Sequence, residues 1–356
     1  MVTDKVVRGW WSTALILAVL LCWGGAAGAA DSDTLYTARV KVADPGAAPR
    51  AEALRQALGL VLLKVTGDRD VAGRAAASAA FRSPERFVQQ YRYVSSPPAG
   101  EDAAPELWFE VQFDDEALQS TLRGAGLPLW GQERPSVLVW LAVADSGRRY
   151  LLAADSGDPI AEALEDAARQ RGLPLIVPLQ DLQDQARIRF ADVWGGFQQQ
   201  IVAASRRYPA AAVLSGRLEK RAGNVWFGDW TLDFGAKQSG WETDGRTPAE
   251  AVSLAIDEVA NRMATQLAIR STTGSSARLH VTVEGISSLG DYARASRYLT
   301  SLTAVRDLSV SAISGDHVDF SIDLDGDAYA LDRAVTVGRV LRPLSTDPQR
   351  VYQLLP

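Results

Sequence analysis

The sequence predicts a multi-module protein of the α/β (α+β) class: a central mixed-sheet α/β domain, residues 134–270, flanked by two small α+β modules, residues 31–130 and 278–356. Two observations predict this class. Segments that alternate apolar and polar residues, as strands do, interleave with segments that carry apolar residues at helical spacing. Polar stretches rich in proline and glycine separate them, and 356 residues suit two or three domains.

Residues 1–30 are predicted to be a signal peptide. Lys5 and Arg8 precede an apolar run at 14–21, which is too short to span a bilayer unaided, and small residues lead up to Asp31. The alternatives are an uncleaved anchor and a lipoprotein attached at Cys22, although Leu21 is large for the position before a lipidated cysteine. We favour cleavage, and therefore a periplasmic protein without a transmembrane span after the signal peptide is removed.

The composition excludes several functional classes. The formal net charge of −6 argues against a nucleic-acid partner, which would require a basic surface. One cysteine and two histidines disfavour a zinc site, a disulfide scaffold and a Cys/His catalytic pair, and no cysteine remains after Cys22 is removed with the signal peptide. The sequence contains no phosphate-binding loop, dinucleotide fingerprint or nucleophile elbow. We therefore expect no cofactor, no metal and no enzymatic activity.

The first module is predicted to have the order β-α-α-β-α. Alternating residues indicate a strand, Pro49 opens a helix that Gly67 ends, a second helix follows Pro84, and Asp114 and Asp115 cap the last helix. The proline-rich stretch 95–105 is predicted to be a loop. The predicted elements are strands Leu35–Val42 and Leu107–Phe113 and helices Arg50–Val65, Pro84–Tyr91 and Glu116–Arg123.

The central domain is predicted from an unbroken apolar run, Val137–Val143, which is typical of a strand buried on both faces. A helix is expected from Pro159 to near Gly172, and a long helix is expected to open at Thr247 with capping-box spacing and end near Ile269. Between them we expect a strand at 175–177, helices at 179–186 and 191–207, and an antiparallel meander of strands at 211–218, 224–234 and 239–242.

The third module follows a polar linker, residues 271–276, and is predicted to have the order β-α-β-β-α. Gly315-Asp316 marks the hairpin turn, and the tail at 351–355 is expected to add an edge strand. The predicted elements are strands Leu279–Glu284, Leu308–Ile313 and Val318–Leu324 and helices Leu289–Leu302 and Ala328–Val340.

Several polar and aromatic residues have a structural explanation. Asp323, Asp325 and Asp327 alternate as in a calcium loop, but the glycine and glutamate that such a loop requires further along are absent, so we expect a turn and a helix cap. His280 and His317 belong to no motif and are interpreted as ordinary strand residues. Trp226 and Trp230 are four residues apart on one predicted strand, share a face, and are expected to pack in the core.

The least ordinary segment is 181–208, where carboxylates, an aromatic residue, paired glycines and two arginines occur together. One interpretation is a polar cleft beside the strand ends of the sheet. The other is that the carboxylates cap helices, the aromatic residues pack in the core and the arginines form ion pairs. The candidate ligand or partner site consists of Asp181, Asp192, Trp194, Arg206, Arg207 and Tyr208.

This segment resembles a bacterial family, the domain of unknown function 2066. The resemblance rests on Arg171–Asp181, Asp192–Phe197, Ala204–Tyr208, Val213–Leu218, Val225-Trp226 and Trp230. It implies an exported protein of Gram-negative proteobacteria. Because that family has no established activity, no catalytic residue is implied.

At the level of fold, the central domain is similar to α/β domains of periplasmic envelope proteins. Examples are the amino-terminal domain of the Tol-system propeller protein, the curli secretion lipoprotein and the lipoprotein activators of penicillin-binding proteins. The first module is similar to the amino-terminal domain of a flagellar assembly protein. These relatives bind partners, so the similarity implies a non-catalytic envelope scaffold or adaptor that contacts other proteins at sheet edges or grooves.

The alternative is a periplasmic small-ligand binder or hydrolase with a polar cleft near Asp181, Asp192 and Arg206. It requires these side chains to converge on one pocket open to solvent. The oligomeric state and the identity of the partners stay open.

Overall fold

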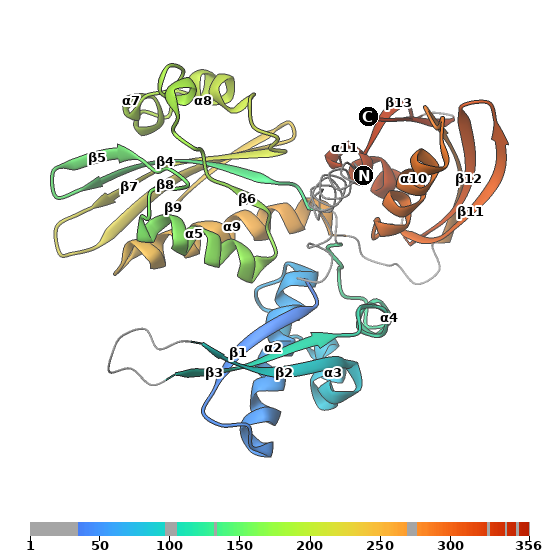
Figure 1. Cartoon of the computed structure of the whole chain (residues 1–356), viewed down its shortest axis with the longest axis horizontal. Coiled ribbons are helices and arrows are strands. Elements are labelled where there is room, and N and C mark those ends of the chain that lie inside the picture. The colour runs from blue at the N-terminus through green and yellow to red at the C-terminus, as the bar shows by residue number, and fades with distance from the viewer. Residues whose placement is uncertain are drawn as a thin grey trace, which may run out of the picture. The chain divides into compact units, whose positions relative to one another are not determined.

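The computed structural model describes residues 35–96, 105–131, 134–268, 276–325, 328–338, 340–346 and 349–355. The predicted signal peptide with Cys22 lies outside the described residues, as do most of the predicted loop at 95–105 and most of the linker at 271–276. The described chain is α+β, with three open sheets and their helices (Figure 1). The predicted class is therefore confirmed.

The first sheet has the order β1-β3-β2 and is antiparallel. Helix α2 supplies much of its core with residues at helical spacing, among them Leu54, Leu58, Val61 and Val65. Gly67 ends α2 in the left-handed conformation. The main elements are β1 (Thr37–Val42), α2 (Ala47–Thr66), α3 (Ser78–Arg82), β2 (Val88–Ser96), β3 (Glu106–Phe113) and α4 (Asp115–Gly124).

The prediction of a helix at 84–91 is wrong. Residues Pro84–Phe87 form one 3₁₀ turn, and β2 begins at Val88. The strand is favoured by a contact that is distant in the sequence: Tyr91 and Tyr93 lie against Phe109 of β3, with ring centroids 5.4 and 5.5 Å away. Such cross-strand aromatic contacts stabilise a sheet and leave no local pattern in the chain.

The central sheet has the order β5-β4-β7-β8-β9, and β6 pairs with the beginning of β4. Strands β4 and β7 are parallel, whereas β7, β8 and β9 form the predicted antiparallel meander. Its strands are β4 (Val137–Asp145), β5 (Arg148–Leu151), β6 (Leu175–Ile176), β7 (Ala212–Lys220), β8 (Trp226–Phe234) and β9 (Lys237–Gly245). Its helices are α5 (Pro159–Arg171), α6 (Leu182–Gln185), α7 (Phe190–Trp194), α8 (Gln198–Ser205) and α9 (Pro248–Leu267).

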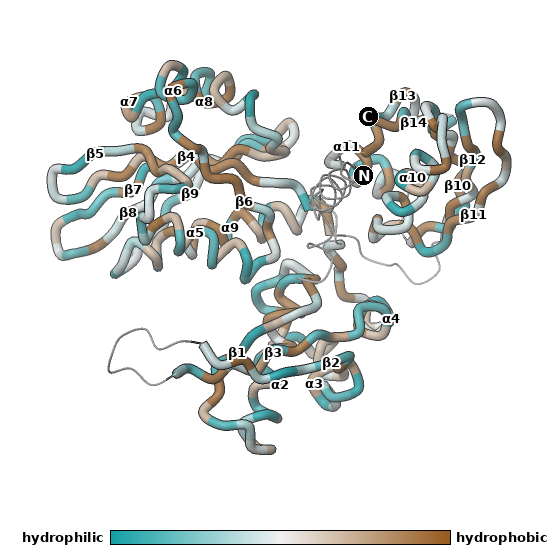
Figure 2. The backbone as a smooth tube through the Cα atoms, viewed as in Figure 1, coloured by the Kyte–Doolittle hydropathy of each residue, from teal (hydrophilic) through white to brown (hydrophobic). Residues whose placement is uncertain are grey.

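Two helical layers enclose this sheet, with α5 and α9 on one face and α7 and α8 on the other (Figure 1). Alternate residues of β4 enter different cores: Val139 and Leu141 pack against α5 and α9, and Leu138 and Trp140 pack under α7 and α8. The prediction that this strand is buried on both faces is confirmed, and Figure 2 shows β4 as strongly hydrophobic.

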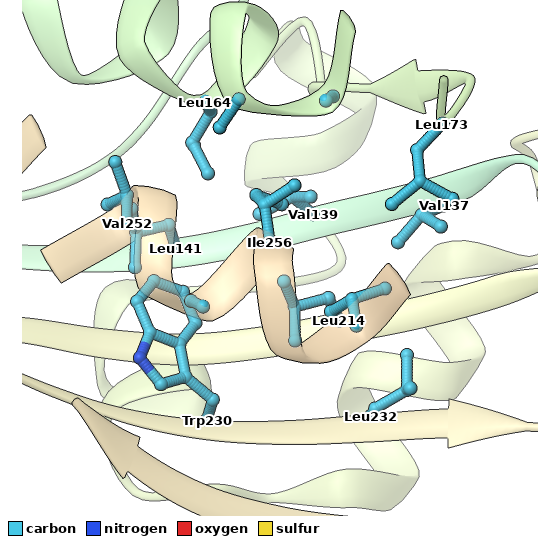
Figure 3. Close-up of a cluster of buried hydrophobic side chains, with 14 of the residues drawn as sticks. Val137, Val139, Leu141, Leu164, Leu173, Leu214, Trp230, Leu232, Val252 and Ile256 are labelled. Carbon is cyan, nitrogen blue, oxygen red and sulfur yellow. The ribbon is translucent and has the colours of Figure 1, made fainter. Parts of the chain in front are cut away.

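The α5–α9 side holds the larger core of this domain. In Figure 3, Leu164 of α5 and Val252 and Ile256 of α9 lie over side chains of β4, β7 and β8. Trp230 is fully buried among them, and Trp226 is nearly so. The expectation that both tryptophans pack in the core is confirmed.

The long helix predicted at 191–207 is two helices, α7 and α8. Gly195 and Gly196 separate them, and Gly196 has φ of 65°, a left-handed conformation that glycine adopts without steric cost. Helix α6 is shorter than predicted because it begins only after its cap, Asp181. The chain therefore bends repeatedly over this face of the sheet.

The third sheet has the order β11-β12-β10-β14-β13, and α10 and α11 contribute to its core. The tail forms β14, but β14 lies between β10 and β13, so its predicted place at the edge is wrong. The unpredicted β13 takes that edge. The elements are β10 (Ser276–Glu284), α10 (Leu289–Ser301), β11 (Val305–Ser314), β12 (His317–Asp325), α11 (Ala328–Val337), β13 (Leu341–Ser345) and β14 (Arg350–Leu354).

A close approach at Gly216 gives a test of the central packing. Gly216 lies directly opposite Trp230, and a Cβ atom at Gly216 would overlap the indole ring. We expect Gly216→Ala to lower the free energy of unfolding by about 1–3 kcal/mol through overpacking. The measurement is urea denaturation followed by tryptophan fluorescence. The control is Gly240→Ala on β9, where an added Cβ would lie 3.4 Å from the Trp230 carbonyl oxygen, an ordinary contact distance. An equal loss in both variants would contradict the prediction.

A buried carboxylate network as the candidate functional site

The segment from α6 to α8 holds a hydrogen-bonded cluster made of Asp181, Asp184, Arg207 and Tyr208, here called the Asp184 network. Asp181 and Asp184 come from the beginning of α6, and Arg207 and Tyr208 follow the end of α8. The network therefore joins two ends of a segment that contains α7 between them. It lies on the sheet face opposite α5 and α9 (Figure 1).

Asp184 is the centre of the network, and its side chain is fully buried. One carboxylate oxygen accepts a hydrogen bond from Arg207 Nη1 at 2.8 Å. The other accepts from the Gln180 backbone N–H at 3.0 Å and from the Tyr208 hydroxyl at 2.5 Å. Both oxygens are thus engaged, as a buried carboxylate requires to offset the loss of its hydration.

Asp181 is partly exposed and makes a bidentate pair with Arg207, with N–O distances of 2.7 and 2.9 Å. The same carboxylate caps α6 by accepting from the backbone N–H groups of Gln183 and Asp184. Hydrogen bonds from Arg207 and from the helix N-terminus lower the pKa of Asp181. The hydrogen bond to Asp181 in turn raises the pKa of Arg207, so this pair stays ionised at any physiological pH.

Tyr208 connects the network to the sheet. Its hydroxyl donates to Asp184 and accepts from the Leu179 backbone N–H at 3.1 Å. Burial and the hydrogen bond to Asp184 raise the pKa of Tyr208 to about 12. Its ring lies edge-on to Trp140 of β4 with centroids 6.1 Å apart, and Trp140 donates to Ser205 Oγ at 2.9 Å. The network at α6 is thus joined to the core by the contact between these two rings.

The arrangement is chemically closed. The carboxylate oxygens of Asp184 and the outer nitrogens of Arg207 all have partners inside the protein. A general acid or base must exchange a proton with a substrate that it can reach, and a ligand-binding arginine must have nitrogens to offer. The geometry is that of a structural lock that fixes α6 and the end of α8.

Three residues of the predicted site lie outside this network. Asp192 accepts a hydrogen bond from the Arg189 N–H at 2.8 Å, at the beginning of α7. Trp194 stacks on Phe190 with ring centroids 5.2 Å apart. Arg206 is exposed and follows α8. The structure therefore brings Asp181, Arg207 and Tyr208 together in one network, whereas Asp192, Trp194 and Arg206 lie outside it. The cleft interpretation requires Asp181, Asp192 and Arg206 to converge, and the contacts of these residues do not support it.

Sequence reasoning missed the central residue and a surface feature. The sequence does not single out Asp184, because its burial depends on Arg207 and Tyr208, which follow α8 and are distant in the sequence. Along the segment 179–202, apolar side chains project into solvent: Leu182 is 85% exposed and Phe197 53% exposed, with Leu179 and Val202 also exposed. In the sequence, the exposure of these side chains is indicated only by a leucine beside a helix cap and a phenylalanine after paired glycines. Both patterns also fit buried residues.

The acidic residues of the calcium-like motif do not form a metal site among the described residues. Asp323 on β12 pairs with Arg278 at 2.8 Å, and the hydrogen bond from Arg278 lowers the pKa of Asp323. Gly326 and Asp327 of the calcium-like motif lie outside the described residues. Across the part of the chain that the structure describes, no three His, Cys, Asp or Glu side chains group as metal ligands would. Nor, within that part, is any helix both long enough and apolar enough to cross a bilayer.

Residues 29–131 match the family model of a domain of unknown function (DUF8605). The resemblance to the domain of unknown function 2066 is therefore wrong: a different family matches, and it matches the first module. The central motifs behind that resemblance have local explanations, since Asp181 caps a helix and Gly196 turns the chain. A search of curated proteins gives no match to the chain.

The network leads to a stability prediction. Asp184→Ala leaves the Tyr208 hydroxyl and the Gln180 N–H without this acceptor and leaves Arg207 Nη1 with Asp181 alone. Because it breaks a buried ion pair, we expect a loss of about 3–5 kcal/mol in the free energy of unfolding. Asp192→Ala is the matched control and removes a carboxylate that only caps a helix, which costs about 0.5–2 kcal/mol. Urea denaturation measures both. A smaller loss for Asp184→Ala than for Asp192→Ala would show that the network is not a lock.

Proposed function

We propose that the chain is an exported periplasmic protein that acts as a non-catalytic adaptor by binding proteins of the cell envelope. The observation that carries this proposal is the exposure of Leu182 and Phe197 on the layer that the Asp184 network fixes. Exposed apolar side chains on a rigid support are typical of protein-binding surfaces. The leader pattern around Lys5, Arg8 and Asp31 supports export.

The physical argument links the lock to the surface. Leu182 is the first residue of α6, directly after the Asp181 cap, and Phe197 lies at the bend between α7 and α8. Such short helices have little stability of their own, so their position depends on tertiary contacts. The Asp184 network supplies those contacts at the beginning of α6 and after α8. Burying the charge of Asp184 is unfavourable, and the proposed function gives a reason for it: the network holds exposed apolar side chains in position for a partner.

The alternative, a small-ligand binder or hydrolase, would need free polar groups that converge. Asp181 is paired with Arg207, Asp192 caps α7 and Arg206 is exposed. Local structure thus explains Asp181 and Asp192, two of the residues that suggested this alternative.

The adaptor function is tested by photo-crosslinking in intact cells of the native host. A benzophenone side chain at position 182 or at position 197 is expected to capture the same envelope protein, since the proposal assigns both positions to one binding surface. The matched control is position 289, because Leu289 is also highly exposed but belongs to the third module. Capture should disappear when the other residue of the pair is changed to glutamate. No shared partner at positions 182 and 197, together with a co-purifying metabolite, would contradict the adaptor proposal.

Export is tested separately by the mass of the purified protein. We expect the chain isolated from envelope fractions to begin near Asp31, because the small residues before it fit signal peptidase. Intact-protein mass spectrometry reads the N-terminus directly. A chain that retains Trp10 would instead be anchored to the membrane, and an acylated Cys22 would identify a lipoprotein.

A further inference from the structure

Strand β11 forms one edge of the third sheet and pairs only with β12 (Figure 1). It has ten residues, and its second part, Leu308–Ser314, contains neither a charged residue nor a proline. An edge strand presents unpaired backbone N–H and C=O groups, which another strand can pair with.

The other edge strands of the described residues carry the features that prevent such pairing. Strand β1 contains Arg39 and Lys41, β5 has only four residues, and β13 contains Arg342 and Pro343. Strands β2 and β9 likewise contain charged residues, and β6 has only two residues. Lysine, arginine, proline and short length are the usual protection of an exposed edge. In the described chain, β11 is the edge that has none of these features over seven consecutive residues, and its one irregularity there is a bulge at Ser311.

The core-facing side of β11 becomes progressively uncovered along the strand. Cross-strand partners point to the same face, so the β11 residues opposite the buried Ile322, Phe320 and Val318 face the core side. These are Leu308, which is half-buried, Val310, which is 40% exposed, and Ile313, which is 69% exposed.

A side chain of helix α10 covers Phe320 on the neighbouring strand, whereas Val310 and Ile313 stay exposed. The Tyr292 ring stacks on Phe320 of β12, with centroids 6.3 Å apart, whereas Val310 beside it stays exposed. A strand added beyond β11 would need apolar residues on this same face.

A second copy of β11 meets this requirement by itself. A bulge at Ser311 places Val310 and Ile313 on one face although they are three residues apart. In an antiparallel pair of two β11 strands, Val310 of one copy lies opposite Ile313 of the other, and the reverse pair follows by symmetry. The polar face then brings together uncharged serines.

We propose that two copies of the chain associate through antiparallel pairing of their β11 strands, which joins the two third-module sheets into one. The inference is independent of the adaptor function, since it concerns another module and requires only the chain itself. One strand pair buries less surface than a standard interface of about 1,200–2,000 Å², so the dimer is expected to be weak and concentration-dependent.

Sedimentation equilibrium of the purified full chain tests the pairing. The mass should rise from monomer toward dimer with concentration. In Val310→Lys/Ile313→Lys, like charges face each other across the pair, which should raise the dissociation constant at least about tenfold. Val310→Asp/Ile313→Asp should behave in the same way. An equimolar mixture of the two variants should dimerise again, because each lysine then faces an aspartate.

Leu344→Lys on β13 is the matched control, since it places a lysine at an exposed apolar position on the opposite edge of the same sheet. It should dimerise as the unmodified chain does, and circular dichroism checks that every variant is folded. The proposal is overturned if the unmodified chain is monomeric at every concentration, even should its edge accept a strand from another protein. It is also overturned if the charged variants still dimerise alone, or if their mixture does not.

Discussion

The structure of the central domain depends on the burial of β4 from both faces. Its odd-numbered residues from Val137 to Val143 face one helical layer, and its even-numbered residues face the other. Each large apolar side chain buried in this way contributes about 1.5–3 kcal/mol, so both layers must be present for the strand to be stable in the sheet. The α5–α9 layer achieves this with long helices, whereas the α6–α8 layer consists of short ones.

That difference explains why the α6–α8 layer depends on a buried carboxylate. The long helix α9 buries a continuous apolar stripe. The short helices α6, α7 and α8 bury less apolar surface, and the chain between them turns sharply at Gly196. The Asp184 network compensates for this smaller apolar burial with charged hydrogen bonds, which hold α6 and the end of α8 in position near Trp140. Three residues of the predicted site, Asp181, Arg207 and Tyr208, therefore hold this layer of short helices in place.

The two proposed contact surfaces share one feature: both consist of apolar side chains that the protein leaves exposed to solvent. They are Leu182 and Phe197 on the α6–α8 layer, and Val310 and Ile313 on the edge strand β11. They differ in what a partner must provide. The first accepts apolar side chains, whereas the second also accepts backbone hydrogen bonds, which restricts its partner to an extended strand.

The sequence by itself determined the fold class, most helices and strands, the burial of β4 and the core positions of Trp226 and Trp230, because these follow from local periodicity and caps such as Asp158 and Gly172. Tertiary structure decided the rest. Tyr91 lies in a strand because Phe109 is beside it, and β14 is internal because it pairs with β10 on one side and β13 on the other. Asp184 is buried because Arg207 and Tyr208, which follow α8, bind it. Each of these outcomes rests on contacts between residues far apart in the chain, and the energy of such contacts leaves no local pattern in the sequence.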